Sequence, residues 1–317
     1  MASIMAPAAS SNAKSPVKDR AATIVQLARD ASVEINAQDI GYLEESRRLL
    51  PKGKALYISH LPKQQWHETE AACRAVRAAG FRPVPHVPVR LLPDAATVDR
   101  VLKGFVDAAQ VDEVLLISGD YPQALGPYTE VLQVLNSGAL QRHGIKRVSV
   151  AGHPEGHSKV QFAEIRRAEL DKARAAQQAG LELTFLTQFF FEEAPFLDWV
   201  RELRSGGVRA RVVGGLAGPT KLSTLIKFAV RCGAGASMRV LTARPAAFAK
   251  LLGDHGPESV LNGLAQARCE GASDFAGVHL FCFGGFVRTC QWLRAIADGR
   301  FTLDDAAGFR VQDTRRE

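Results

Sequence analysis

The chain has 317 residues, of which 46% are hydrophobic and 23% charged, and its 40 Lys and Arg against 33 Asp and Glu give a formal net charge of +7. This is ordinary globular usage, which excludes disordered and fibrous proteins. There is no apolar run long enough to cross a bilayer, and the first residues lack the apolar segment of a secretory signal. We therefore expect a soluble, cytoplasmic protein with no membrane partner.

The excess positive charge favours an anionic partner. Its basic residues are dispersed in pairs, such as Arg47-Arg48, Arg166-Arg167 and Arg315-Arg316, and they form no aromatic-rich basic stripe. A nucleic-acid partner is therefore not expected, and a small molecule bearing phosphate or carboxylate groups is favoured. The five cysteines are odd in number and show no paired spacing, which indicates buried thiols in a reducing compartment; they are Cys73, Cys232, Cys269, Cys282 and Cys290.

In chain order, residues 1–20 are rich in Ala, Ser, Pro and Lys without periodicity and predict a flexible tail, as do residues 311–317 at the other end. Between them, eight short apolar runs predict strands, at 31–35, 54–59, 81–87, 112–118, 146–151, 183–190, 209–215 and 277–283. Stretches with apolar residues at helical spacing separate them. Eight such units predict a single α/β domain over residues 21–310, a (β/α)8 TIM barrel.

In such a barrel the functional residues gather where the strands end. Glu34 is a carboxylate late in the first predicted strand. Burial without a partner would raise its pKa and make it a general acid, whereas pairing with Arg or Lys would make it structural. Ser59 and His60 end the second strand and His86 ends the third.

Asp120 follows the fourth strand in Ser118-Gly119-Asp120, and a carboxylate there can accept hydrogen bonds from a heterocycle or cap a turn. After the fifth strand, His153-Pro-Glu-Gly-His157 offers two imidazoles. Their spacing would suit metal ligands on a helix, but Pro154 and Gly156 favour a turn, so no metal is expected. We expect this loop to bind a ligand's oxygens instead.

Gln188 is an amide within the sixth strand, and a buried amide needs partners for both its donors and its acceptor. The three phenylalanines that follow it are more typical of a core than of a cofactor site.

These pieces together resemble the methylenetetrahydrofolate reductase family, flavoproteins with a (β/α)8 barrel that interconvert 5,10-methylenetetrahydrofolate and 5-methyltetrahydrofolate. The resemblance spans Glu34 to about Phe283 and is carried by Ile-Ser-Gly-Asp120, Gly-His-Pro-Glu-Gly-His157 and Leu-Thr-Gln188-Phe-Phe-Phe, with Pro-His86 and Gly-Val-His-Leu-Phe in support.

The resemblance implies that the catalytic residues are Glu34, which protonates N10 of the folate, and Asp120 and Gln188, which contact the pterin. It implies FAD as cofactor, with hydride transfer at flavin N5, and a folate as the substrate. The implied FAD contacts are Ser59, His60, His86, Ser118, Gly119, Asp120, Tyr128, His153, His157, Glu169 and Lys172.

The chain also departs from the family. Leu222 stands where the family carries an aromatic residue that stacks on folate or nicotinamide, Ala175-Ala176 replaces an Arg-Lys pair that contacts FAD, and residues 283–285 read Phe-Gly-Gly in place of Thr-Leu-Asn. These changes lie on the face that NAD(P)H would use. We therefore expect weak or absent NAD(P)H use and an enzyme that can run oxidatively; a homo-oligomer is compatible with the sequence.

Two other classes stay open. A metal-dependent barrel hydrolase would use His153 and His157 as ligands, and a non-catalytic subunit would bind folate or flavin without turning it over.

Overall fold

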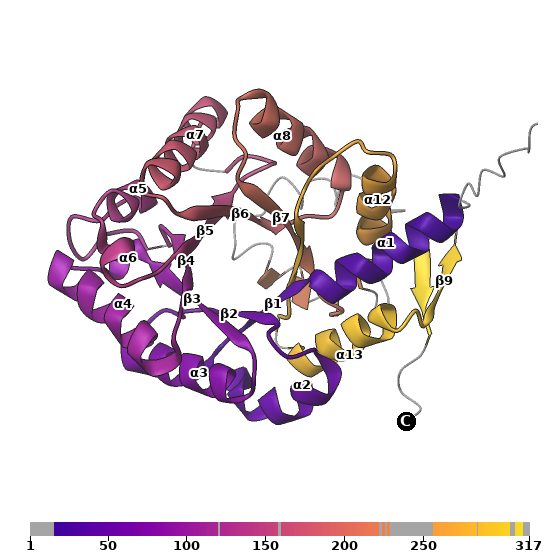
Figure 1. Ribbon diagram of the computed structural model, residues 1–317, viewed down its shortest axis with the longest axis horizontal. Coiled ribbons are helices and arrows are strands. Elements are labelled where there is room, and N and C mark those ends of the chain that lie inside the picture. The colour runs from indigo at the N-terminus through magenta and orange to yellow at the C-terminus, as the bar shows by residue number, and fades with distance from the viewer. Residues whose placement is uncertain are drawn as a thin grey trace, which may run out of the picture.

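The chain folds as a closed barrel of eight parallel strands. The computed structural model describes residues 16–119, 121–157, 160–221, 224–225, 227–228, 256–283, 285–304 and 308–312. The strands follow one another around the barrel in chain order, and β8 pairs with β1 to close it. Figure 1 shows the strands at the centre with the helices around them. The predicted (β/α)8 fold is confirmed.

The strands lie within two residues of the predicted runs at every boundary. They span Ser32–Ile35 (β1), Ala55–Ile58 (β2), Arg82–Pro88 (β3), Glu113–Ile117 (β4), Arg147–Gly152 (β5), Glu182–Phe189 (β6), Arg211–Ala217 (β7) and Gly277–Phe281 (β8). Most of their residues are apolar because both faces of a parallel strand are covered.

The helices pack around the barrel. They are α1 (Pro16–Asp30), α2 (Leu43–Leu49), α3 (Trp66–Ala78), α4 (Ala95–Ala109), α5 (Val131–Leu135), α6 (Ala139–Arg142), α7 (Phe162–Gln178), α8 (Glu193–Ser205), α12 (Glu258–Cys269) and α13 (Phe286–Ala297), with 3-10 turns η1 (Ala37–Tyr42) and η2 (Val89–Leu91). A hairpin of β9 (Phe301–Asp304) and β10 (Gly308–Val311) follows them.

The predicted tails need correction where they meet these elements. Helix α1 begins at Pro16, inside the predicted tail of residues 1–20, and β10 ends at Val311, inside the predicted tail of residues 311–317. Ile24 and Leu27 of α1 are fully buried, so this helix is tied down by packing that its polar first turn does not reveal. Residues 1–15 and 313–317 lie outside the described residues.

Helix α4 illustrates how the sequence builds the outer layer. Asp94 caps its first turn, with a side-chain oxygen 2.7 Å from the backbone nitrogen of Thr97. Val98, Val101 and Phe105 are buried on one face at helical spacing. Each such side chain contributes about 1.5–3 kcal/mol by leaving water, which holds the helix against the strands.

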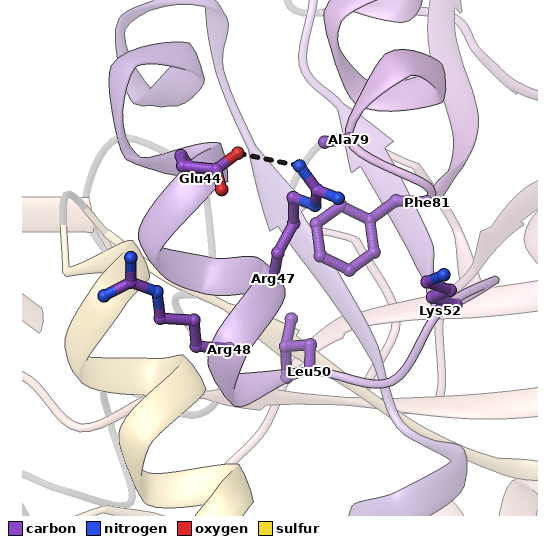
Figure 2. A pocket seen from close by; sticks show the side chains of 7 residues that line it. All are labelled: Glu44, Arg47, Arg48, Leu50, Lys52, Ala79 and Phe81. Carbon is purple, nitrogen blue, oxygen red and sulfur yellow. Dashed lines mark hydrogen bonds and ion pairs between the residues drawn. The ribbon is translucent and has the colours of Figure 1, made fainter.

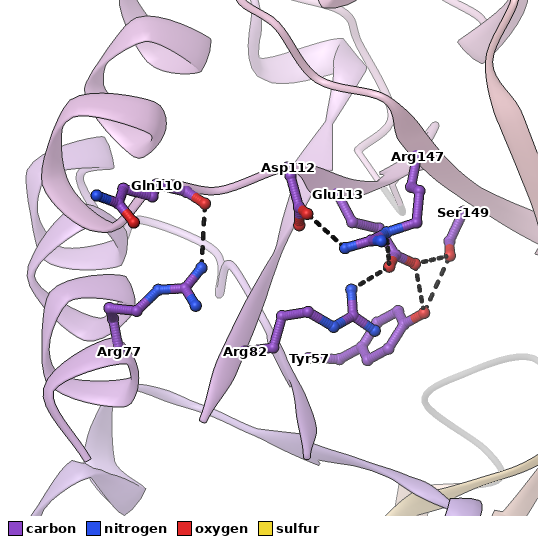
Figure 3. Close-up of polar contacts among 8 residues, drawn as sticks. All are labelled: Tyr57, Arg77, Arg82, Gln110, Asp112, Glu113, Arg147 and Ser149. Atoms are coloured by element: carbon purple, nitrogen blue, oxygen red, sulfur yellow. Dashed lines mark hydrogen bonds and ion pairs between the residues drawn. The ribbon is translucent and has the colours of Figure 1, made fainter. Parts of the chain in front are cut away.

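The amino end of the barrel is closed by a buried charged network, shown in Figure 3. Glu113, the first residue of β4, accepts hydrogen bonds from the Tyr57 hydroxyl at 3.0 Å and the Ser149 hydroxyl at 2.9 Å. Arg82 and Arg147, the first residues of β3 and β5, form ion pairs with the same carboxylate. Because these side chains fill the amino end of the barrel, we expect a ligand to bind at the opposite end, where the strands finish.

Three of the predicted buried thiols are buried, namely Cys73, Cys282 and Cys290. Cys269 is exposed at the end of α12, which corrects the prediction for that residue, and Cys232 lies outside the described residues. Within the described part of the chain, no helix is long and apolar enough to cross a membrane.

Candidate active site

The carboxylate of Glu34 lies at the carboxyl end of the barrel among polar side chains from the neighbouring strands. Its Oε1 accepts a hydrogen bond from the Ser59 hydroxyl at 2.8 Å. Its Oε2 lies 3.6 Å from Nε2 of His86 and 3.9 Å from Nε2 of His279. The closed barrel brings these groups together, because β1 lies between β2 and β8.

The pKa of Glu34 corrects the sequence-based expectation. Burial raises it, as we expected, but the interaction with His279, the positive charges of His86 and His279 and the hydrogen bond from Ser59 outweigh burial. The net result is a pKa below the usual value. In this structure Glu34 is therefore a carboxylate at neutral pH, and its partners are histidines rather than the Arg or Lys of the alternative.

Both histidines are buried against Glu34. His279 is fully buried and His86 is 7% exposed, and Nε2 of each has no hydrogen-bond partner in the structure. Nδ1 of His279 lies 2.8 Å from the Ser32 hydroxyl. The Tyr57 ring meets His279 edge to face, with ring centroids 4.9 Å apart. Burial lowers the pKa of His86, partly opposed by the charge of Glu34.

Sequence reasoning missed Ser32 and His279 as site residues. His279 belonged to the motif that supports the family resemblance, but no role was assigned to it. The alternation of side chains along a strand could have revealed it. His279 and Phe281 lie on the same face of β8, and β8 must pair with β1, which carries Glu34, once eight strands close into a barrel.

At the end of β4, Ser118 and Gly119 are half-buried. Gly119 has a φ of +85°, and a Cβ there would lie 2.8 Å from the Tyr121 ring and 3.2 Å from Cβ of Pro88. Only glycine tolerates this turn, which explains the Ser-Gly-Asp sequence. Asp120 itself lies outside the described residues.

The loop after β5 is organised by Glu169, which is fully buried. The backbone N–H of His153 donates to its Oε1 at 3.0 Å, and Arg166 and the Trp199 indole donate to its Oε2 at 2.7 and 3.0 Å. The Glu169 carboxylate therefore holds this loop through contacts within the protein. Burial lowers the pKa of His153 to about 4, with a contribution from the nearby charge of Lys172.

The rings of His153 and His157 meet edge to face at 5.8 Å. Among the described residues, no group of three or more His, Cys, Asp or Glu side chains is arranged to hold a metal ion. In that part of the chain the two histidines thus lack the further ligand that the metal-dependent hydrolase hypothesis requires.

The remaining predicted FAD contacts differ in where their side chains lie. Ser59 faces the site, but His60 points the other way into α3, where Nδ1 lies 2.8 Å from the Thr69 hydroxyl and the ring stacks on Trp66 at 4.1 Å. Tyr128 is half-buried against the main core. Lys172 is half-buried on α7, where burial lowers its pKa against the opposing charges of Glu169 and Glu130.

Gln188 is exposed, which corrects the expectation of a buried amide. Its side-chain oxygen accepts from the Phe189 backbone N–H at 3.2 Å, and the exposed side chain stands next to the last residue of β6. Phe189 and Phe190 are buried, so the prediction that these rings belong to the core is confirmed for both. Leu222, the predicted substrate contact, lies outside the described residues.

An aromatic cluster lies beside Glu34 at the ends of β6 and β8. Phe281, which pairs with Glu34 in the strand register, is stacked on Phe283 with ring centroids 6.1 Å apart. Phe189 meets Phe283 edge to face at 5.1 Å. Phe283 has a φ of +46°, a left-handed conformation that is rare for a bulky residue and concentrates at functional sites.

Two hollows lie away from this site. One, of about 220 Å3, is lined by residues of α2, of the loop after it and of the segment between α3 and β3, and Figure 2 shows these residues with the ion pair of Glu44 and Arg47. The other, of about 630 Å3, lies between α7 and the loop after α8. None of the predicted site residues lines either hollow.

No protein-family model matches the chain. Among solved structures, it is similar to dihydropteroate synthase from Thermus thermophilus in complex with 6HMPPP, with 12% identity, 84% of this chain and 91% of that chain covered, and a TM-score of 0.47. It is also similar to a deoxyribose phosphate aldolase from Aeropyrum pernix, with 9% identity, coverage of 90% and 100%, and a TM-score of 0.47. Likeness at this level assigns neither a family nor a substrate.

Proposed function

We propose that this protein is an FAD-dependent oxidoreductase similar to methylenetetrahydrofolate reductase, which interconverts 5,10-methylenetetrahydrofolate and 5-methyltetrahydrofolate. One observation carries the proposal: the Glu34 carboxylate stands at the functional end of the barrel, fixed by Ser59 and flanked by two buried imidazole nitrogens that lack partners. Such a group is suited to proton transfer to a bound substrate.

The residues present fit a flavin. Nε2 of His86 is a buried polar atom without a partner at the end of β3, and Ser59, Ser118, His153 and His157 follow the ends of β2, β4 and β5. FAD, when bound, supplies hydride exchange with the one-carbon unit of the folate. We do not include His60 or Glu169 among its contacts, since the polar groups described above occupy both within the protein.

Glu34 delivers the proton. A carboxylic acid here gives its proton to N10 of the folate as the five-membered ring opens, and the carboxylate takes the proton back in the reverse reaction. The exposed amide of Gln188 offers an acceptor and two donor hydrogens to the edge of a pterin. We assign Asp120 the role of accepting hydrogen bonds from the pterin.

The aromatic cluster supports restricted use of NAD(P)H. Phe281 and Phe283 fill space next to Glu34 with rings that stack on each other. Ala175 and Ala176, which replace the Arg-Lys pair of the family, are buried in α7 and present no charge to a phosphate. We therefore assign the protein a folate as its principal partner in electron exchange and propose a physiological electron carrier other than a nicotinamide.

The test is single-turnover reduction of the FAD-loaded protein without oxygen. We expect 5-methyltetrahydrofolate to bleach the flavin and NADH or NADPH to do so slowly or not at all. Rapid bleaching by NADH would refute the restricted-donor part. Bound FAD that no folate reduces would refute the enzyme and leave a non-catalytic binding protein.

Glu34→Gln tests the proton transfer. It is expected to keep FAD and folate binding and to lower folate turnover by a factor of about 10² or more. The matched control is Glu44→Gln, since this carboxylate is 73% exposed on α2. Equal turnover in the two variants would remove Glu34 from the role of acid.

A further inference from the structure

The low pKa of Glu34 leaves open how a carboxylate would deliver a proton at neutral pH, and the geometry around His279 suggests an answer. Three side chains form a chain across the β1–β8 seam: the Ser32 hydroxyl is 2.8 Å from Nδ1 of His279, and Nε2 of His279 is 3.9 Å from Oε2 of Glu34. His279 and Ser32 are paired in the strand register, so the backbone fixes this arrangement.

The chemistry of the groups sets the direction of each contact. A carboxylate can only accept, so the imidazole satisfies it by carrying a hydrogen on Nε2. Nδ1 of the neutral ring is then an acceptor, and the Ser32 hydroxyl donates to it. Nε2 is fully buried without another partner, so an N–H there has no alternative acceptor in the structure.

We propose that His279 is a positioning residue that shares a proton with Glu34 and returns it as Glu34 protonates the substrate, an inference that rests on the proposed function. In the loaded state the His279–Glu34 pair holds one more proton than at rest, so His279 is an imidazolium that faces the Glu34 carboxylate. The Nε2–H bond breaks and an O–H bond forms on Glu34. That O–H bond then breaks as the proton bonds to substrate nitrogen, leaving a carboxylate and neutral His279 with its hydrogen on Nδ1, and a proton taken up from water at Nε2 restores the loaded state. No electrons move in these steps.

The distance requires a small approach, from 3.9 Å to a hydrogen bond of about 2.9 Å. A ligand that covers the barrel mouth favours it, because exclusion of water strengthens the attraction between the two groups. His86 supplies a second imidazole, with Nε2 3.6 Å from the same oxygen, and the Ser59 hydroxyl donates to the other oxygen of Glu34. These contacts hold the carboxylate in position while the proton moves.

Other titratable groups face Glu34 from the described elements around it. Tyr57 on β2 and Cys282 after β8 both have a pKa raised by burial, so they stay neutral at physiological pH. Burial raises the pKa of Asp39 in η1, to which the charge of Glu34 adds. Among these groups and the two histidines, His279 is the one whose Nδ1 contacts a hydroxyl and whose Nε2 faces the Glu34 carboxylate.

The first test is the pH dependence of the step that needs an acid. The FAD-loaded protein is reduced chemically, mixed with 5,10-methylenetetrahydrofolate without oxygen, and flavin reoxidation is followed across pH. In His279→Gln the amide still donates a hydrogen bond but cannot share a proton. We expect the alkaline loss of rate to move to lower pH by about one unit or more. An unchanged profile overturns the proposal.

His143→Gln is the matched control, since His143 also faces a carboxylate, with Nε2 2.8 Å from Oδ1 of Asp99, far along the chain from the site. It is expected to leave the profile unchanged. A fully buried histidine can fail to tolerate replacement, so Ser32→Ala provides a milder change that releases Nδ1 of His279. Its expected effect on the profile has the same sign as that of His279→Gln.

The second test uses NMR of the imidazole nitrogens and does not depend on turnover. In the FAD-loaded protein, His279 should show hydrogen on Nε2 and none on Nδ1, and its titration should shift in Glu34→Gln. In Ser32→Ala both tautomers should appear. Coupled titration without folate turnover would refute the proposed function and keep the proton-sharing pair. Independent titration of His279 would refute the pair whatever the turnover.

Discussion

Replacing Glu113 by Gln is expected to destabilise the barrel more than any loss of a single hydrogen bond. Glu113 is 4% exposed, and it neutralises Arg82 and Arg147, whose side chains are 28% and 34% exposed. The amide keeps the shape but removes the charge, which leaves Arg82 without its ion-pair partner and Arg147 with Asp112 alone. Breaking a buried pair in this way costs about 3–5 kcal/mol.

Because the arginines are partly exposed, water screens part of the electrostatic cost. We therefore expect the free energy of unfolding to fall by about 3 kcal/mol, the lower end of that range. Tyr57→Phe is the matched control, because it removes a hydroxyl that contacts the same carboxylate and Ser149, and no charge. It is expected to cost about 1 kcal/mol. Urea denaturation followed by circular dichroism measures both. Equal losses in the two variants would refute the electrostatic reasoning.

Three further predictions concern local features. Burial lowers the pKa of His60 from 6.5 to about 4, so between these pH values the unfolded chain binds a proton that the folded protein does not bind. The free energy of unfolding is therefore expected to fall as pH drops from 6.5 towards 4, by up to about 3 kcal/mol. Denaturation of His60→Gln at both pH values should show a smaller loss. Gly119→Ala, at a φ of +85° and with a ring in contact, should lower the melting temperature by more than Gly53→Ala, where φ is +78° and no atom lies within 4 Å. Asp94→Ala removes the cap of α4 and should lower the urea concentration at the midpoint of unfolding, and an unchanged midpoint would contradict the capping role.

The fold could be predicted from the sequence because each strand of a parallel barrel requires a short apolar run followed by a helix. Each strand is buried on its outer face and is followed by a helix, so apolar runs such as 112–118 stand out from their surroundings. Helix α1 was missed at its start because the charged residues Lys18, Asp19 and Arg20 hide any apolar pattern there, and its stability comes from packing against distant helices.

The site could be predicted only in part. Glu34, Ser59 and His86 lie together in the structure, since position at a strand end determines which residues share the barrel mouth, and their proposed roles stay predictions. The low pKa of Glu34 could not be predicted, because it depends on which side chain of β8, far away along the chain, faces β1 after closure. The contacts of Glu169 could not be predicted either, since only the fold shows that its carboxylate accepts a hydrogen bond from the Trp199 indole.

The most direct measurement is the absorption spectrum of the FAD-loaded protein before and after 5-methyltetrahydrofolate is added without oxygen. The account predicts that the oxidised flavin band disappears and that 5,10-methylenetetrahydrofolate forms in equal amount. A flavin band that stays unchanged at saturating folate, or a protein that takes up no FAD at all, would contradict it.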